Sequence, residues 1–127
     1  MQAFREAIES GDFEGAVALM ADDVEFRSPV VFKPYRGRDE VRAILLAAFR
    51  VFEDFRYVRV MASADGSDHA LVFKARVGDR EVEACDFLHV NAEGLIDDFA
   101  VIVRPLSGLN ALADAMRAQL ESLSPPG

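Results

Sequence analysis

One long amphipathic helix followed by four consecutive strand patterns is the feature that most constrains the fold. Apolar side chains recur at steps of three and four between about Arg38 and Glu53, which predicts a helix with one buried face. The segments after it alternate in polarity and end at turn residues: 55–64, 69–77, 81–90 and 95–104. Because short turns join neighbouring segments as hairpins, we expect one antiparallel sheet packed on the helix.

Four further elements are expected around this unit: helices at 2–10, 13–20 and 106–122, and a strand at 24–28. The order is then α-α-β-α-β-β-β-β-α, an α+β fold in a single domain, 1–127. A curved sheet wrapped around a helix leaves a cone that is open at one end. We expect that cone to be a ligand pocket.

Composition narrows the class of function. The net charge is −8, which repels phosphate backbones, so no nucleic-acid partner is expected. The longest apolar run, 43–49, is far shorter than the roughly 20 residues of a membrane span. The chain opens without a signal-peptide pattern and has a single cysteine, Cys85, which predicts a cytoplasmic protein.

The sequence also gives no pattern for a cofactor or a metal. One cysteine and two histidines are too few for a dedicated zinc site. No glycine-rich phosphate loop follows a predicted strand. We therefore expect chemistry without a cofactor.

Asp86 is the most unusual residue of the predicted sheet. It shares one face of its strand with apolar residues such as Val82 and Leu88. Desolvation there disfavours the charged form, so we expect a raised pKa and a carboxyl that can donate a hydrogen bond. Asp86 either faces a ligand or bonds a backbone amide, an arginine, or a tyrosine such as Tyr35 or Tyr57.

Asp97 repeats this pattern closer to a turn, on the face that carries Phe99 and Val101. If both acids face one cavity, Asp97 is the candidate for a second acid or base. The alternative is an exposed hairpin carboxylate.

The opposite face of the Asp86 strand carries Cys85, Phe87 and His89. Its apolar character predicts a homodimer through the sheet face. His89 is then a dimer contact or a surface residue, and Cys85 an unreactive thiol.

The candidate pocket consists of inward positions on these elements: Phe4, Phe26, Ser28, Tyr35, Phe49, Phe52, Leu88, Phe99, Val101 and Val103. Ser28 is placed either to hydrogen-bond a ligand or to cap the turn that follows its strand. A basic segment adjoins the pocket: Arg27, Lys33, Arg36, Arg38 and Arg42. It is either an attractor for an anionic ligand or a solvated loop and helix face.

Three stretches resemble the nuclear transport factor 2-like (NTF2-like) superfamily: Ser10-Gly11-Asp12-Phe13-Glu14-Gly15, Leu19-Met20-Ala21-Asp22-Asp23-Val24-Glu25-Phe26 and Tyr35-Arg36-Gly37-Arg38-Asp39-Glu40-Val41. This superfamily includes ketosteroid isomerase, polyketide cyclases of the SnoaL type and scytalone dehydratase. The resemblance implies a cone-shaped fold and, commonly, a dimer. It specifies the fold better than the chemistry.

Within the superfamily, the resemblance to ketosteroid isomerases extends to individual positions. Those enzymes use a carboxylate base, a tyrosine on the first helix and a protonated aspartic acid on a later strand. The matching positions here are Ser28, Phe4 and Asp86. Serine cannot replace the carboxylate base and phenylalanine cannot donate a hydrogen bond. Steroid isomerisation by that mechanism is therefore not expected.

Two functions follow with equal weight. The first is an isomerase, cyclase or dehydratase acting on a small, mostly apolar carbonyl compound. Asp86 would stabilise an oxyanion, and Asp97 or a water molecule would move the proton. The second is a dimeric binding module that holds an apolar metabolite without converting it. A purely structural domain is a third, weaker possibility.

Overall fold

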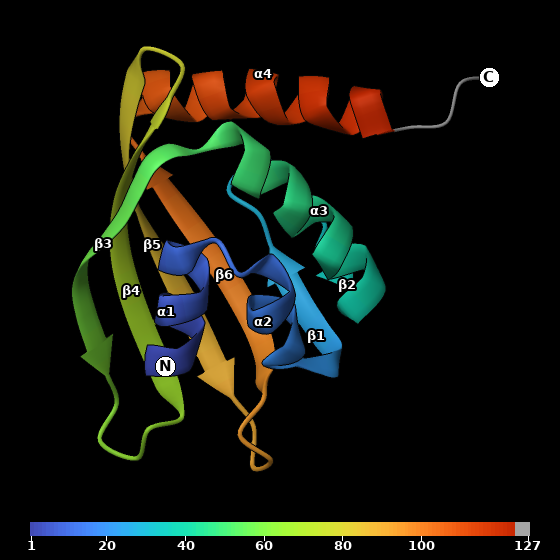
Figure 1. The fold of residues 1–127 in the computed structure, drawn as a ribbon, viewed down its shortest axis with the longest axis vertical. Coiled ribbons are helices and arrows are strands. Elements are labelled where there is room, and N and C mark those ends of the chain that lie inside the picture. The colour runs from blue at the N-terminus through green and yellow to red at the C-terminus, as the bar shows by residue number, and fades with distance from the viewer. Residues whose placement is uncertain (124–127) are drawn as a thin grey trace.

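The computed structural model describes residues 1–123, and residues 124–127 lie outside the described part. Within residues 1–123 there are four helices and six strands. Their bounds are α1 Gln2–Ser10, α2 Phe13–Ala18, β1 Met20–Arg27, β2 Tyr35–Arg36, α3 Arg38–Val51, β3 Glu53–Ala62, β4 Asp68–Val77, β5 Arg80–Val90, β6 Ile96–Arg104 and α4 Leu106–Leu123. The predicted α+β fold and helix-wrapping sheet are confirmed (Figure 1).

The strands form one curved, unclosed sheet in the order β2-β1-β6-β5-β4-β3. β3 to β6 pair as successive antiparallel hairpins, and β2 pairs antiparallel with β1. β1 and β6, however, run parallel. The prediction of a wholly antiparallel sheet was wrong for this pair, and the sheet is mixed. A long stretch of chain connects β1 to β6, so no tight turn sets their relative direction.

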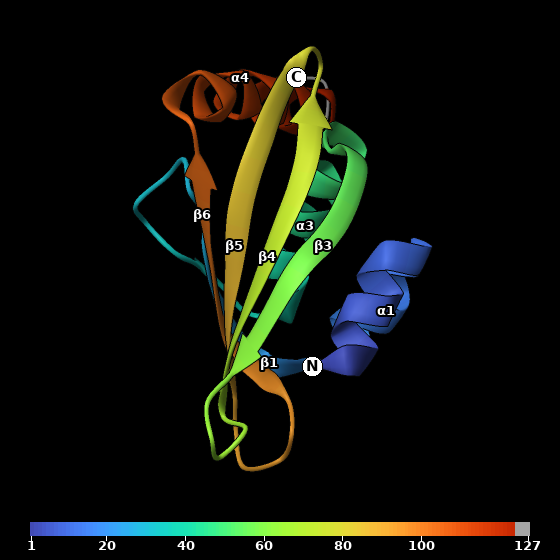
Figure 2. The same ribbon diagram turned by 90° about the vertical axis from the view of Figure 1, so that its left-hand side faces the viewer.

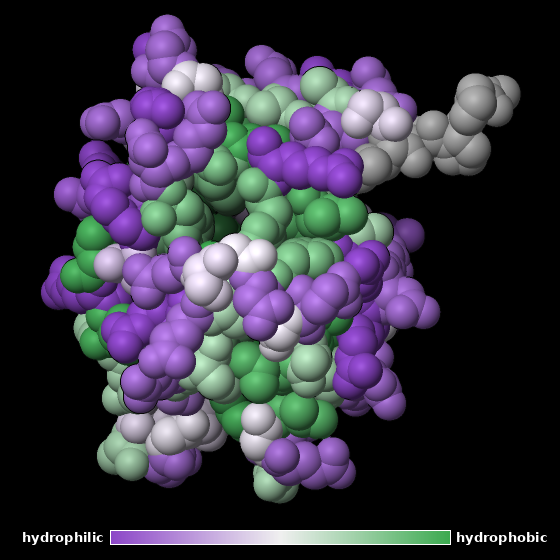
Figure 3. Space-filling model, in the orientation of Figure 1, coloured by the Kyte–Doolittle hydropathy of each residue, from purple (hydrophilic) through white to green (hydrophobic). Residues whose placement is uncertain are grey.

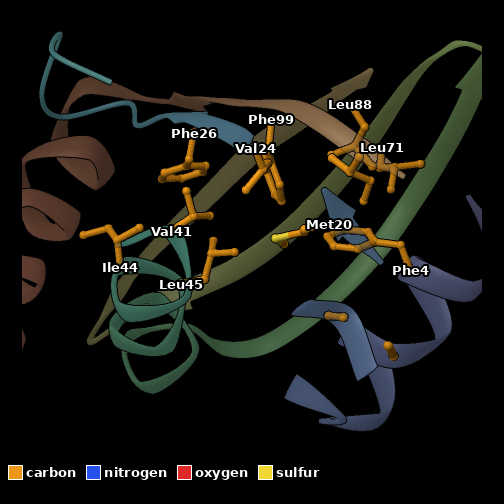
Figure 4. Close-up of a cluster of buried hydrophobic side chains, with 13 residues drawn as sticks. Phe4, Met20, Val24, Phe26, Val41, Ile44, Leu45, Leu71, Leu88 and Phe99 are labelled. Atoms are coloured by element: carbon orange, nitrogen blue, oxygen red, sulfur yellow. The ribbon is translucent and has the colours of Figure 1, made fainter. Parts of the chain in front are cut away.

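α3 lies against the inner face of the sheet (Figures 1 and 2). Its stripe residues Val41, Ile44 and Leu45 are buried, the first of them completely. In Figure 4 they point toward Val24 and Phe26 on β1. Burial of each such side chain contributes about 1.5–3 kcal/mol of transfer free energy, so this stripe holds α3 inside the curved sheet.

The N-terminal elements differ from the prediction in two ways: the first strand begins earlier than 24, and the two-residue strand β2 was not predicted. The helix expected through Met20 ends at Ala18, and Met20 is the first residue of β1. The Ile96 amide donates a 2.9 Å hydrogen bond to the Leu19 carbonyl, and Met20 pairs with Ile96 in the parallel ladder. Met20 is fully buried. A buried apolar residue at this position is consistent both with the last turn of a helix and with the start of a strand, so the sequence pattern did not decide the boundary.

α4 crosses one end of the cone (Figure 1). It lies close to β5 at Gly108, where a Cβ atom would lie 2.6 Å from Val82 Cγ1 and 3.1 Å from the Glu81 carbonyl oxygen. The missing side chain therefore sets the distance between helix and sheet. α4 covers the inner face at this end.

Candidate functional site

A cavity of about 360 Å³ lies between α3, α4, the loop after β1 and the inner face of the sheet. This volume is in the range of small-molecule sites. In Figure 3 the surface below α4 is hollowed, and the residues around the hollow are mostly apolar. The walls are rich in phenylalanine, from Phe4 on α1 to Phe99 on β6. The cavity is therefore suited to a flat, apolar molecule.

Most of the predicted pocket residues line this cavity: Phe4, Phe26, Ser28, Tyr35, Phe49, Phe52, Phe99 and Val101. Leu88 and Val103 are buried but are not among the lining residues. Leu88 belongs to the core cluster that contains Phe4, and Val103 to the cluster under α4 that contains Leu112. Both residues are therefore part of the hydrophobic core and not of the cavity wall.

Asp86 is the only polar or charged residue among the buried residues of the described chain, and it lines the cavity. It is 4% exposed. Tyr57 on β3 donates a 2.8 Å hydrogen bond from Oη to Asp86 Oδ2. Burial raises the pKa of Asp86 to about 7, and the Tyr57 hydrogen bond opposes that rise. Near neutral pH both the acid and the carboxylate are therefore populated.

Tyr57 is held by aromatic neighbours. Its ring makes edge contacts with Phe55 at 4.9 Å and Phe73 at 6.1 Å between centroids. Burial, followed by the Asp86 charge and the hydrogen bond, raises the pKa of Tyr57 above its ordinary value. The phenol therefore stays protonated and acts as a fixed donor beside the carboxyl.

Asp97 does not line the cavity, contrary to expectation. The β5–β6 register shifts so that His89 pairs with Asp98 and Val90 with Ile96. Asp97 is thus the extra residue of a β-bulge. Its Oδ1 atom lies 2.6 Å from His89 Nδ1, and this hydrogen bond raises the pKa of His89. The alternation of side chains along the strand predicted that Asp97 faces inward. That alternation is interrupted at a bulge, so the prediction fails here.

A model of the SnoaL-like domain matches residues 1–99. The chain belongs to the SnoaL-like family. Its fold and its structural relatives also place it in the NTF2-like superfamily, as the sequence resemblance implied. No curated protein matches the chain.

Two solved structures resemble this SnoaL-like protein over nearly all of its length. A steroid delta-isomerase from Pseudomonas aeruginosa is 45% identical with a TM-score of 0.88, over 92% of this chain and 85% of that one. An uncharacterized protein with a cystatin-like fold from Silicibacter pomeroyi is 38% identical with a TM-score of 0.90, over 96% and 85%.

A more distant likeness extends the fold comparison. A Mycobacterium tuberculosis protein solved in complex with estradiol-17β-hemisuccinate is 21% identical, with a TM-score of 0.66 over 84% of this chain and 92% of that one. This likeness shows the shared fold alone.

Ser28, which the sequence resemblance aligns with the ketosteroid isomerase base, caps a turn. Its Oγ atom accepts hydrogen bonds from the amides of Val30 at 3.1 Å and Val31 at 2.9 Å. The hydroxyl also lies at the edge of the cavity. It therefore holds the loop after β1 in place, as one of the two sequence alternatives stated.

The predicted basic segment is largely neutralised by neighbouring acids. Its four arginines pair with carboxylates: Arg27 with Asp98, Arg36 with Glu25, Arg38 with Asp22 and Arg42 with Glu14. Neither these arginines nor Lys33 lines the cavity. The geometry favours a solvated face over an attractor for anions.

Several lining residues were missed by the sequence analysis: Ile8, Phe55, Phe73, Leu112, Met116, Arg117 and Leu120. The apolar stripe at 109, 112, 116 and 120 was a usable signal, because such a face must cover something. An apolar stripe shows that a helix face is buried but not what it packs against. The sequence pattern was equally consistent with packing against another helix and with covering a cavity.

Residues 1–123 contain neither a membrane-spanning helix nor a metal-binding cluster of side chains. None of their helices is long and apolar enough to cross a membrane. Nor do three His, Cys, Asp or Glu side chains come together there as a metal-binding group.

Burial raises the pKa of the Cys85 thiol, which keeps the thiol protonated.

Proposed function

We propose that this SnoaL-like protein binds a small, mostly apolar molecule and places its carbonyl or hydroxyl group against Asp86 and Tyr57. The observation that carries the proposal is the buried Asp86–Tyr57 pair in the wall of an otherwise apolar cavity. Burying a carboxyl among apolar side chains costs free energy. Such a cost is typical of a binding or catalytic site.

The proposed chemistry is a cofactor-independent isomerisation, cyclisation or dehydration. A neutral Asp86 carboxyl donates to a carbonyl oxygen and stabilises the negative charge that develops there. A pKa of about 7 also suits a group that gives and takes a proton at neutral pH. The relative from Pseudomonas aeruginosa, a steroid delta-isomerase, supports this class of ligand.

The alternative is a binding module that converts nothing. One observation favours it: Asp86 is the only carboxylate residue among the described residues that line the cavity. Ser28, which replaces the family base, is occupied with its turn. In the enzyme, a bound water or Asp86 itself must therefore accept the substrate proton, since Asp97 is bonded to His89.

Ligand binding and turnover at Asp86 distinguish the two. Androst-4-ene-3,17-dione and simple aryl enones are the first compounds to screen by thermal shift. We expect Asp86→Leu to weaken binding about tenfold, the equivalent of one lost hydrogen bond to a partly desolvated group. Asp86→Asn retains a donor for the carbonyl and keeps most of the affinity. In the wild-type protein, affinity for the carbonyl falls above about pH 7, as Asp86 loses its proton.

Exchange of carbon-bound ligand protons in D₂O, followed by NMR, measures the chemistry. An enzyme exchanges them and Asp86→Asn does not, whereas the binding module exchanges none. Equal affinity of wild type and Asp86→Leu for every compound that binds would contradict the proposed site.

We further propose that two copies pair through the outer face of the sheet. In Figure 2, β3, β4 and β5 lie in front and α3 behind them. Phe87 is 43% and Ile102 62% exposed on this outer face. Exposed apolar groups that lie on adjacent strands are typical of an interface.

Phe87→Glu is expected to shift the protein from dimer to monomer in sedimentation velocity, since it buries a charge at the contact. Phe32→Glu is the matched control, because Phe32 is fully exposed in the loop after β1. A wild-type protein that sediments as a monomer would contradict the dimer.

A further inference from the structure

Among the described residues that line the cavity, Arg117 is the one whose side chain is permanently charged. The described lining contains two residues with a charged group, Asp86 and Arg117, and they come from two different elements, β5 and α4. Asp86 is buried, whereas the Arg117 side chain is 69% exposed. The carboxyl therefore lies at the closed wall and the guanidinium at the solvent-open edge.

Arg117 is not engaged by a strong ion pair. The ion pair that the structure gives it joins Nη1 to Asp114 Oδ1 at 3.6 Å, three residues earlier on the same helix. Both side chains are more than two-thirds exposed, and such pairs contribute little. This contrasts with Arg27, whose Nη2 donates to Asp98 Oδ2 at 2.7 Å. The donors of Arg117 are thus accessible to another acceptor.

The surroundings of Arg117 favour an amphipathic partner. On α4, Met116 precedes it and lines the cavity with it. In the loop after β1, Val30 and Val31 also line the cavity and are more than two-fifths exposed. The outer end of a ligand that fills the apolar cavity would therefore lie among apolar side chains and near one guanidinium group. Guanidinium groups pair with carboxylates in planar, two-bond geometry.

We propose that the ligand is an amphipathic acid: a flat apolar body with a carbonyl or hydroxyl at the Asp86–Tyr57 end and a carboxylate that pairs with Arg117 at the opening. This inference rests on the proposed function, because it assumes that the apolar body occupies the cavity. It adds that Arg117 is a specificity-determining residue. Acids are then preferred over neutral analogues of the same shape, although the whole protein is acidic.

The test compares acids with their methyl esters. The probes are 6-hydroxy-2-naphthoic acid and 4′-hydroxybiphenyl-4-carboxylic acid, which differ in length, each with its methyl ester. Affinities are measured by calorimetry on the wild-type protein, Arg117→Gln, Arg80→Gln and Asp86→Leu. Arg80 is the matched control because it is exposed and has only a 3.9 Å pair with Asp79, outside the lining residues.

We expect at least one acid to bind the wild-type protein about two- to fivefold more tightly than its ester, as for an accessible ion pair. Arg117→Gln removes this preference, whereas Arg80→Gln retains it. Added salt reduces it, since the pair is open to solvent. Asp86→Leu weakens acid and ester alike and leaves their ratio unchanged.

The failures of the two proposals are distinguishable. If acid and ester bind equally well, or if Arg117→Gln keeps the preference, the role of Arg117 is wrong; a loss of affinity in Asp86→Leu then still supports the proposed function. If none of the four compounds binds, both proposals are overturned.

Discussion

The Asp86→Asn variant is expected to be more stable than the wild-type protein at pH 8 and to lose that advantage as the pH falls toward 4. In the folded protein, burial raises the pKa of Asp86 from 3.8 to about 7. Between these values the folded state binds more protons than the unfolded state. The wild type therefore loses stability as the pH rises, at up to about 1.4 kcal/mol per pH unit.

The measurement is urea unfolding of both proteins between pH 4 and 8. The other titrating groups are common to the two proteins, so they cancel in the difference. Asparagine can still accept the Tyr57 hydrogen bond and has nearly the same shape as aspartate. The substitution therefore creates no new void in the core. The difference should widen with pH and level off above about pH 7. A constant difference would show that the buried carboxyl does not titrate in this range.

Tyr57→Phe provides a second variant for the same experiment. The Tyr57 hydrogen bond stabilises the charged form of Asp86 and so opposes the rise of its pKa. Without the hydroxyl, the pKa of Asp86 rises further and the pH-dependent loss of stability extends to higher pH. Levelling at the wild-type pH would mean that the hydrogen bond is not made in solution.

The Gly108→Ala variant is expected to lose about 1–3 kcal/mol of stability, the usual cost of an overpacked contact. The added methyl would lie 2.6 Å from Val82 Cγ1 and 3.1 Å from the Glu81 carbonyl oxygen. In an open helix the same change stabilises by about 1 kcal/mol, because alanine has the higher helix propensity. The sign of the change in unfolding free energy therefore shows whether the packing contact or the helix propensity has the larger effect.

Val82→Ala is the matched partner, since it removes the Cγ1 atom that the new methyl would meet. Unfolding free energies of the two single variants and the double variant form a cycle. We expect the double variant to be more stable than the sum of the single effects. Additive effects, or a stabilised Gly108→Ala, would contradict the close packing of α4 on β5.

The sequence predicted the elements whose pattern is local. The stripe from Val41 to Leu45 and the alternation around Asp86 each depend on neighbours within one helix or strand, and both were found where expected. The parallel pairing of β1 with β6 depends on partners far apart in the chain, which no local pattern encodes. The bulge at Asp97 likewise becomes visible only when two strands are aligned.

The same distinction applies to the site. Asp86 was identifiable because a carboxylic acid stands out in an apolar row, and Tyr57 was among the partners considered for it. Arg117 was not identifiable, because an arginine on an amphipathic helix is ordinary until the helix is placed. Its position at the cavity depends on how α4 crosses the sheet.

The cavity is assembled from two separable stretches of chain. The polar pair, Tyr57 and Asp86, lies within residues 1–99, which match the family model, whereas the α4 wall begins at Leu106, beyond that match. Substitutions within the 18 residues of α4 can therefore reshape one wall of the cavity with the carboxyl and the phenol left in place.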